Sequence, residues 1–243
     1  MFTSKKSTPR HQESRRRFLR TMALFFGVIG TSLATIFPAF AKSRLRPPGA
    51  IEEGEFLASC IKCGQCVQVC PVQAIDLADI DEGMGIGVPY IDARSQACDF
   101  SCDAVQCILA CPTGSLSPTV SKKEDVRMGL ARVARLEACL AYHGQGFKGQ
   151  ARGPHFQGLL RYAEIDRWKP IPVKDYPEDR ELCDLCVCRC PIEKAISLRP
   201  VEGGKGMKPV IHEACVGCGV CEMICPVEPT VIVIDERKTW ETA

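Results

Sequence analysis

The sequence has few aromatic residues and little net charge. Aromatic side chains make up 7% of its 243 residues, and the formal net charge is +2. Seven of the lysines and arginines stand in residues 1–41, and the rest of the chain carries 24 basic against 28 acidic residues. A long basic stripe with interleaved aromatic side chains is missing, so we expect no nucleic-acid partner.

The residue sets of common catalytic sites are missing as well. We find no Ser/His/Asp set, no paired carboxylates beside a substrate loop, and no Cys-x-x-Cys-His motif for covalent haem. The glycines at 83–87 and 203–206 precede strand patterns, whereas a dinucleotide or phosphate loop precedes a helix. The sequence therefore predicts a protein without a visible substrate site of its own.

The first 41 residues have the layout of a signal peptide. A basic start is followed by an apolar run from about Met22 to Phe37 and by Ala39-Phe40-Ala41, a small-x-small cleavage site. The segment Ser14-Arg15-Arg16-Arg17-Phe18-Leu19-Arg20 resembles the twin-arginine signal. We expect export to the periplasm by the twin-arginine pathway, which carries folded proteins. A retained membrane anchor is the alternative, because the run nearly reaches spanning length.

Cysteine is abundant: of 17 cysteines, 16 stand in four groups and one, Cys139, stands alone. A proline follows each group. The groups are Cys60, Cys63, Cys66 and Cys70; Cys98, Cys102, Cys107 and Cys111; Cys183, Cys186, Cys188 and Cys190; and Cys215, Cys218, Cys221 and Cys225. The first and fourth groups have the C-x2-C-x2-C-x3-C-P spacing of bacterial ferredoxins.

This spacing suits a [4Fe-4S] cubane, whose four iron corners each need a soft thiolate. Three closely spaced cysteines let one loop reach three corners. Disulfides would require an even number of cysteines and would not require the prolines. Zinc sites usually consist of two separated C-x2-C pairs. The pattern therefore predicts iron–sulfur clusters.

The chain contains an internal duplication. Strand patterns at 74–77 and 88–92 lie between the first two groups, and patterns at 195–198 and 209–211 lie between the last two. We expect an α+β fold of tandem bacterial ferredoxin-like units, each with two clusters. The predicted parts are the signal peptide (1–41), the first unit (42–121), a linker (122–178) and the second unit (179–243).

In two-cluster ferredoxins the fourth cysteine of a motif binds the other cluster. This rule predicts four clusters. We name their cysteines set 1 (Cys60, Cys63, Cys66, Cys111), set 2 (Cys98, Cys102, Cys107, Cys70), set 3 (Cys183, Cys186, Cys225 and one more) and set 4 (Cys215, Cys218, Cys221, Cys190).

Two cysteines are candidates for the fourth member of set 3. The regular position is residue 180, which is an arginine. Cys188 would crowd the loop, whereas Cys139 requires a 43-residue excursion of the chain, which costs little because closure entropy grows only logarithmically. We expect Cys139, with Cys188 as the substitute.

The linker is predicted to be a helix followed by an insert. Val126, Leu130, Val133, Leu136 and Leu140 have helical spacing within 122–142. Residues 144–177 contain glycines early and prolines late, and we expect an irregular surface insert there.

The chain resembles the NapG/MauM family of ferredoxin-type proteins. The matching pieces are the twin-arginine leader, Arg46-Pro47-Pro48-Gly49-Ala50, CIKCGQCVQVCP, MGLA at 128–131, CL at 139–140, CDLC at 183–186 and CVGCGVC. The resemblance implies an upstream ligand for set 3, as at Cys139. The chain departs from the family pattern in the long gap from Cys139 to Cys183 and in the x3 opening of group two.

The resemblance also implies a function. Family members accompany periplasmic nitrate reductase or methylamine oxidation systems. They carry electrons from a membrane ferredoxin-type quinol dehydrogenase, resembling NapH or MauN, toward a periplasmic acceptor such as a cytochrome or reductase. The sequence itself supports a multi-cluster electron relay. An iron–sulfur subunit or a maturation factor of a larger oxidoreductase is the alternative.

Overall fold

The computed structural model describes residues 16–28, 44–79, 85–102, 104–166, 169–204, 206–236 and 238. The chain divides into two units. The first comprises Met1–Lys42 and Ile80–Ile86, and the second Ser43–Asp79 and Gly87–Ala243. In the first unit the structure describes a helix over residues 16–28, which is exposed. Among the described residues, no helix has the length and apolar character that a membrane crossing requires. The predicted cleavage site lies outside the described residues.

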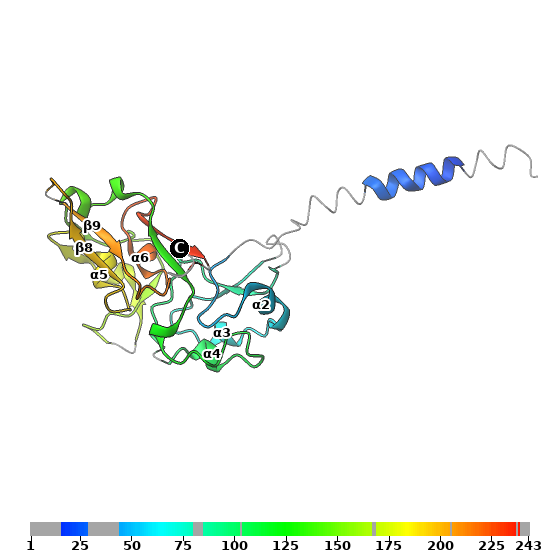
Figure 1. Ribbon diagram of the computed structural model, residues 1–243, viewed down its shortest axis with the longest axis horizontal. Coiled ribbons are helices and arrows are strands. Elements are labelled where there is room, and N and C mark those ends of the chain that lie inside the picture. The colour runs from blue at the N-terminus through cyan, green and yellow to red at the C-terminus, as the bar shows by residue number, and fades with distance from the viewer. Residues whose placement is uncertain are drawn as a thin grey trace, which may run out of the picture. The chain divides into compact units, whose positions relative to one another are not determined.

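The second unit contains strand pairs at both places where the sequence predicts strands between cysteine groups. β1 (Asp76–Leu77) pairs antiparallel with β2 (Pro89–Tyr90), and β8 (Ile196–Pro200) pairs with β9 (Met207–Ile211). Each hairpin lies between two cysteine groups, as the duplication predicts. Figure 1 shows β8 and β9 next to α5 and α6, whereas α2, α3 and α4 gather in another part of the unit.

Each cysteine group contributes one short helix. These helices are α3 (Gln65–Gln68), α4 (Gln106–Leu109), α5 (Leu185–Cys188) and α6 (Val220–Ile224). The first helix of the unit, α2 (Glu53–Ser59), precedes them. The carboxylate of Glu52 caps it by accepting hydrogen bonds from the backbone N–H groups of Gly54 and Glu55. The proline that follows each group has no N–H to continue a helix, so these helices end after one turn.

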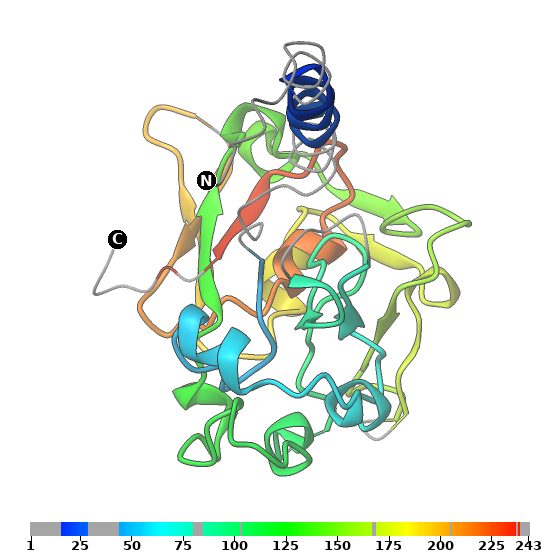
Figure 2. The ribbon, with the colours of Figure 1, turned by 90° about the vertical axis from the view of Figure 1, so that its right-hand side faces the viewer.

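The predicted helix over 122–142 is wrong. The segment forms η2 (Lys123–Asp125), strand β3 (Gly129–Val133), η3 (Leu136–Ala138) and η4 (Ala141–His143). β3 pairs antiparallel with β10 (Ile232–Glu236), about 100 residues away in sequence, and Figure 2 shows the two strands side by side. Pairing with this β-branched strand overrides the helical spacing of the apolar residues.

The insert is more regular than the sequence predicts. β4 (Phe147–Gly149) pairs with β7 (Glu178–Arg180), and β5 (Leu159–Leu160) pairs with β6 (Ile171–Pro172), which leads into η5 (Val173–Asp175). Leu160 and Tyr162 are 1% exposed and belong to the same hydrophobic core as the cysteine loops. The insert is therefore packed against the ferredoxin-like halves.

The Arg46-Pro47-Pro48-Gly49-Ala50 element fastens the start of the unit. Arg46 is 1% exposed, and its side chain donates to the backbone oxygen of Pro89 at 2.9 Å and forms an ion pair with Glu53 at 2.6 Å. Its guanidinium also lies over the Phe56 ring. A buried charge needs such partners, so this arginine joins α2 to the β1–β2 hairpin.

Candidate metal centres

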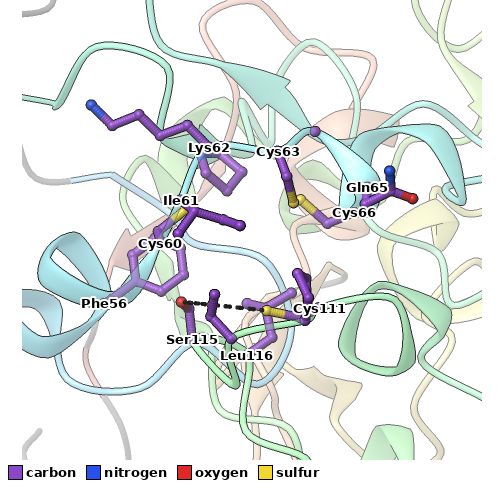
Figure 3. Close-up of a pocket in the computed structure, with 14 residues that line it drawn as sticks. Phe56, Cys60, Ile61, Lys62, Cys63, Gln65, Cys66, Cys111, Ser115 and Leu116 are labelled. Carbon is purple, nitrogen blue, oxygen red and sulfur yellow. Dashed lines mark hydrogen bonds between the residues drawn. The ribbon is translucent and has the colours of Figure 1, made fainter.

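The cysteines of set 1 surround one cavity. Cys60, Cys63, Cys66 and Cys111 line it together with apolar residues such as Phe56 and Leu116. Figure 3 shows their sulfur atoms pointing toward one opening. Three of the cysteines come from group one, and Cys111 comes from the end of group two. The structure thus brings together the residues that the ferredoxin pairing rule predicts.

The second half contains two corresponding cavities. One is lined by the cysteines of set 4, Cys190, Cys215, Cys218 and Cys221. The other is lined by Cys139, Cys183, Cys186 and Cys225. In both, the remaining wall is predominantly aliphatic, including Ile196 and Ile211 in the first cavity and Leu198 and Val231 in the second. Each cavity again combines cysteines from separate segments.

The cysteines of set 2 also lie together. Burial, followed by the nearby charges of Cys102 and Cys70, raises the pKa of the Cys107 thiol to about 12. Burial also raises the pKa of the buried Cys98 thiol, and Cys107 is the charged neighbour that adds most to this rise. The structure therefore gathers sets 1, 3 and 4 around cavities, and the mutual influence of their thiols indicates that the members of set 2 lie near one another.

The geometry distinguishes Cys139 from Cys188. Cys139 follows η3, is buried, and lines the cavity with Cys183 and Cys186. Cys188 is exposed, and its thiol lies 3.6 Å from the backbone oxygen of Leu185. Arg180, at the regular cysteine position, ends strand β7 and pairs with Glu178. The structure places Cys139, and not Cys188, with set 3.

The two regular groups share an unusual backbone conformation. Lys62 and Gly64 in group one have φ angles of 58° and 73°, and the matching Gly217 and Gly219 in group four have 72° and 90°. A left-handed residue before and after the second cysteine curls each loop around its cavity. The repeated sequence therefore produces a repeated loop.

Burial dominates the acidity of the thiols. It raises the pKa of Cys66 and of Cys183 to about 11, and that of Cys218 well above its ordinary value. Iron binds thiolates, so protons must leave when a metal group is bound. These enclosed thiols favour a ligand whose positive charge offsets the cost of burying thiolates.

Hydrogen-bond donors act in the other direction. The backbone N–H of Ala74 donates to the Cys70 sulfur at 3.3 Å. At Cys111, burial raises the pKa, but the backbone groups of Leu116 and Thr113 and the Thr113 hydroxyl outweigh it, and the net pKa is lowered. Donors of this kind stabilise thiolates and tune iron–sulfur clusters.

Sequence reasoning missed the residue that braces group two. Arg161, in the insert, donates from its guanidinium to the backbone oxygens of Ser101 at 3.1 Å and Phe100 at 3.2 Å. Its backbone N–H donates to Asp99 at 2.8 Å. The long x3 loop between Cys98 and Cys102 is thus held by the insert. Two features of the sequence could have pointed to this contact: the x3 opening of group two and the long gap from Cys139 to Cys183, in which Arg161 lies.

The cysteine sets fit cubane clusters. Within the described residues, no three His, Cys, Asp or Glu side chains come close enough together to hold a single metal ion. The sulfurs instead stand around cavities, as a cubane requires because each thiolate binds a different iron corner. Such a cluster, when bound, supplies one-electron redox chemistry.

Comparisons with known proteins agree with this chemistry. The 4Fe-4S dicluster domain matches residues 59–115, and the 4Fe-4S binding domain matches residues 208–229. The ferredoxin-type protein NapG of Escherichia coli is 35% identical over 235 residues, covering 92% of this chain and 86% of its own. The methylamine utilization ferredoxin-type protein MauM of Paracoccus denitrificans is 34% identical over 229 residues, covering 90% and 85%.

The chain belongs to the NapG/MauM family of ferredoxin-type proteins. It is a ferredoxin-type iron–sulfur electron-transfer protein with two 4Fe-4S domains. The dicluster match contains all of groups one and two, and the second match contains group four. Group three lies between the two matches, and there this family member takes Cys139 from upstream into its cavity.

Proposed function

We propose that this protein carries four [4Fe-4S] clusters in two tandem two-cluster units. The sixteen cysteines of sets 1 to 4 are the ligands, and Cys139 completes set 3. The observation that carries this proposal is the composition of three cavities, each lined by apolar side chains and by four cysteines that come from two or three separate segments. The neighbours of Cys107 support the same arrangement for set 2.

The protein relays electrons from a membrane quinol-oxidising partner toward a periplasmic redox enzyme. The partner is a ferredoxin-type protein resembling NapH or MauN, and the acceptor is a cytochrome or reductase. The protein reaches the periplasm folded, through a twin-arginine signal at Arg15-Arg16. Membership in the NapG/MauM family supports this role, and so does the basic, apolar leader.

Deletion of the gene tests the relay. Quinol-driven turnover of the periplasmic enzyme should fall, whereas its activity with an artificial dye donor should stay unchanged, because the dye bypasses the relay. An equal fall of both activities would identify the protein as a subunit or maturation factor of the enzyme. Purified protein should contain about sixteen irons, on the rule of four per cluster.

The route of export has its own test. Replacing Arg15-Arg16 by Lys-Lys should keep the protein in the cytoplasm with its clusters, because the receptor reads the arginine pair. Unchanged periplasmic yield would contradict this route. Mass spectrometry of the exported protein should give Lys42 as the first residue, and an intact leader would instead indicate a membrane anchor.

A further inference from the structure

Within each half, two cysteine sets meet through neighbouring helices. α3, which carries Cys66 of set 1, contacts α4, which carries Cys107 of set 2. In the second half, α5 carries Cys186 of set 3 and contacts α6, which carries Cys221 of set 4. Set 1 therefore adjoins set 2, and set 3 adjoins set 4.

A third contact joins the two halves directly at their cysteines. The backbone N–H of Cys98, a member of set 2, donates to the backbone oxygen of Cys218, a member of set 4, at 3.2 Å. Both cysteines are buried. The two loops are thus in direct contact through this hydrogen bond. Sets 2 and 4 are therefore neighbours across the two halves.

Small residues allow this close approach. A Cβ atom at Gly219 would come within 2.6 Å of the Ala93 Cβ and 3.4 Å of the Ala97 Cβ. Ala97 is 0% exposed, and its backbone N–H donates to the Met223 sulfur at 3.2 Å. Arg94 reaches across the same contact to the backbone oxygen of Cys225 at 3.0 Å. The contact is closely packed and bound from several sides.

We propose that the four sets form one linear series in the order 1, 2, 4, 3, joined between the halves at Cys98 and Cys218. The inference deepens the proposed function, since it rests on the sets holding clusters. It makes sets 1 and 3 the two ends at which electrons enter and leave. For each electron that the quinol-side donor loses at one end, the periplasmic acceptor gains one at the other.

The two inner sets are better enclosed than the end at set 1. Of the sixteen cysteines, all of which the structure describes, Cys63 of set 1 is the exposed one. Ile61 beside it is 64% exposed. Cys98 and Cys218, at the junction, are 8% and 6% exposed. This contrast fits a series with an accessible end and an interior junction.

Single-cysteine variants of the full chain test the order. Cys63→Ala and Cys183→Ala each remove one end set, and Cys102→Ala and Cys215→Ala each remove one inner set. Each variant is purified anaerobically, its iron is counted, and its fold is checked by circular dichroism. EPR of the fully reduced protein then shows whether any cluster gives the narrow signal of an isolated spin or whether all are broadened by a neighbour.

The linear order predicts different spectra for the two kinds of variant. Removing an end set isolates no cluster, because sets 2 and 4 still adjoin each other. Removing set 2 leaves set 1 without a neighbour, and removing set 4 leaves set 3 without one. About one isolated spin per molecule should therefore appear in each of these two variants. The expected iron loss is about four of sixteen in every variant.

Two results would overturn the order. An isolated spin in Cys63→Ala or Cys183→Ala would show two separate pairs of sets, and its absence in Cys102→Ala or Cys215→Ala would show an end set next to another set. If one variant does not fold, the matching variant in the other half decides the same question. Iron far below sixteen in the wild-type protein would instead refute the proposed function, before the order is tested.

Discussion

The regular cysteine groups, one and four, differ from the irregular groups, two and three, in what shapes their loops. In the regular groups the shape is local. Left-handed residues stand at the same two positions in both loops, and the spacing of the cysteines is identical. The turn of each regular loop around its cavity is therefore set by residues within the loop.

The irregular groups depend on distant residues. Arg161, which lies 60 residues after Ser101 in the sequence, holds the loop between Cys98 and Cys102. Cys139, which lies 44 positions before Cys183, completes the cavity of set 3. Both residues come from the segment between the two halves. This segment therefore supports the two groups that depart from the regular spacing, the x3 opening of group two and group three with its arginine at position 180.

The largest expected effect concerns the distant cysteine of set 3. Cys139→Ala should remove about four of sixteen irons, because a cubane needs a thiolate at each corner. Cys188→Ala is the matched control and should retain all of its iron, since Cys188 lies outside the cavity. Iron analysis and EPR of both variants check this. Iron loss in Cys188→Ala alone would exchange the roles of the two cysteines.

The next prediction compares the stability effects of substitutions at matching positions of the two regular loops, Gly217 in group four and Lys62 in group one. Gly217→Ala should lower the free energy of unfolding by about 3 kcal/mol, because its Cβ would meet the Gly129 backbone at 2.3 Å and its φ is 72°. Lys62→Gly should change it by no more than about 1 kcal/mol, since relief from the left-handed conformation offsets the greater freedom of the unfolded chain.

Anaerobic guanidinium unfolding of both variants measures these changes. If Gly217→Ala were as stable as the wild-type protein, the close approach of β3 to this loop would be wrong. If Lys62→Gly were strongly destabilised, the side chain of Lys62 would stabilise its loop beyond the shared backbone conformation.

A smaller effect concerns the reduction potential of set 2. Arg161→Gln should lower it by roughly tens of millivolts, because the guanidinium charge stabilises the more negative, reduced cluster. Arg161→Lys retains the charge but not the forked hydrogen bonds to the loop, so its potential should stay closer to that of the wild-type protein. EPR-monitored redox titration compares the three proteins. Equal potentials in all of them would limit Arg161 to a structural role.

The smallest effect concerns the strand pair that replaced the predicted helix. The Arg132 guanidinium donates to both carboxylate oxygens of Asp235, at 2.9 and 3.2 Å, and lowers the pKa of Asp235. A lowered pKa stabilises the fold at neutral pH, and this contribution disappears as the pH falls below about 4 toward the folded-state value.

Asp235→Asn should therefore unfold slightly more easily than the wild-type protein at pH 7, and the two should converge in acid. Unfolding midpoints measured across this pH range check the prediction. Asp179→Asn is the control, since its partner Lys148 is 80% exposed and an exposed pair contributes little. A difference that grows in acid would contradict the assigned sign.

Much of the site could be predicted because most ligands of an iron–sulfur cluster are closely spaced cysteines of one loop, and their spacing is visible in the sequence. The membership of each set followed from the exchange of the fourth cysteine between neighbouring motifs, a rule that uses only sequence order. The hairpins between the groups were also predicted, because their strand patterns end at turns. The choice of Cys139 followed from one missing cysteine and the low cost of closing a long loop.

The sequence by itself thus determined the chemistry of this protein, its duplication and the membership of its cysteine sets. Tertiary structure alone decided that residues 129–133 form a strand, because their partner strand lies about 100 residues away. It also decided that Arg161 braces group two and that Cys98 meets Cys218. Local spacing specifies what a loop can bind, whereas contacts between distant segments form only when the whole chain packs, and no local pattern encodes them.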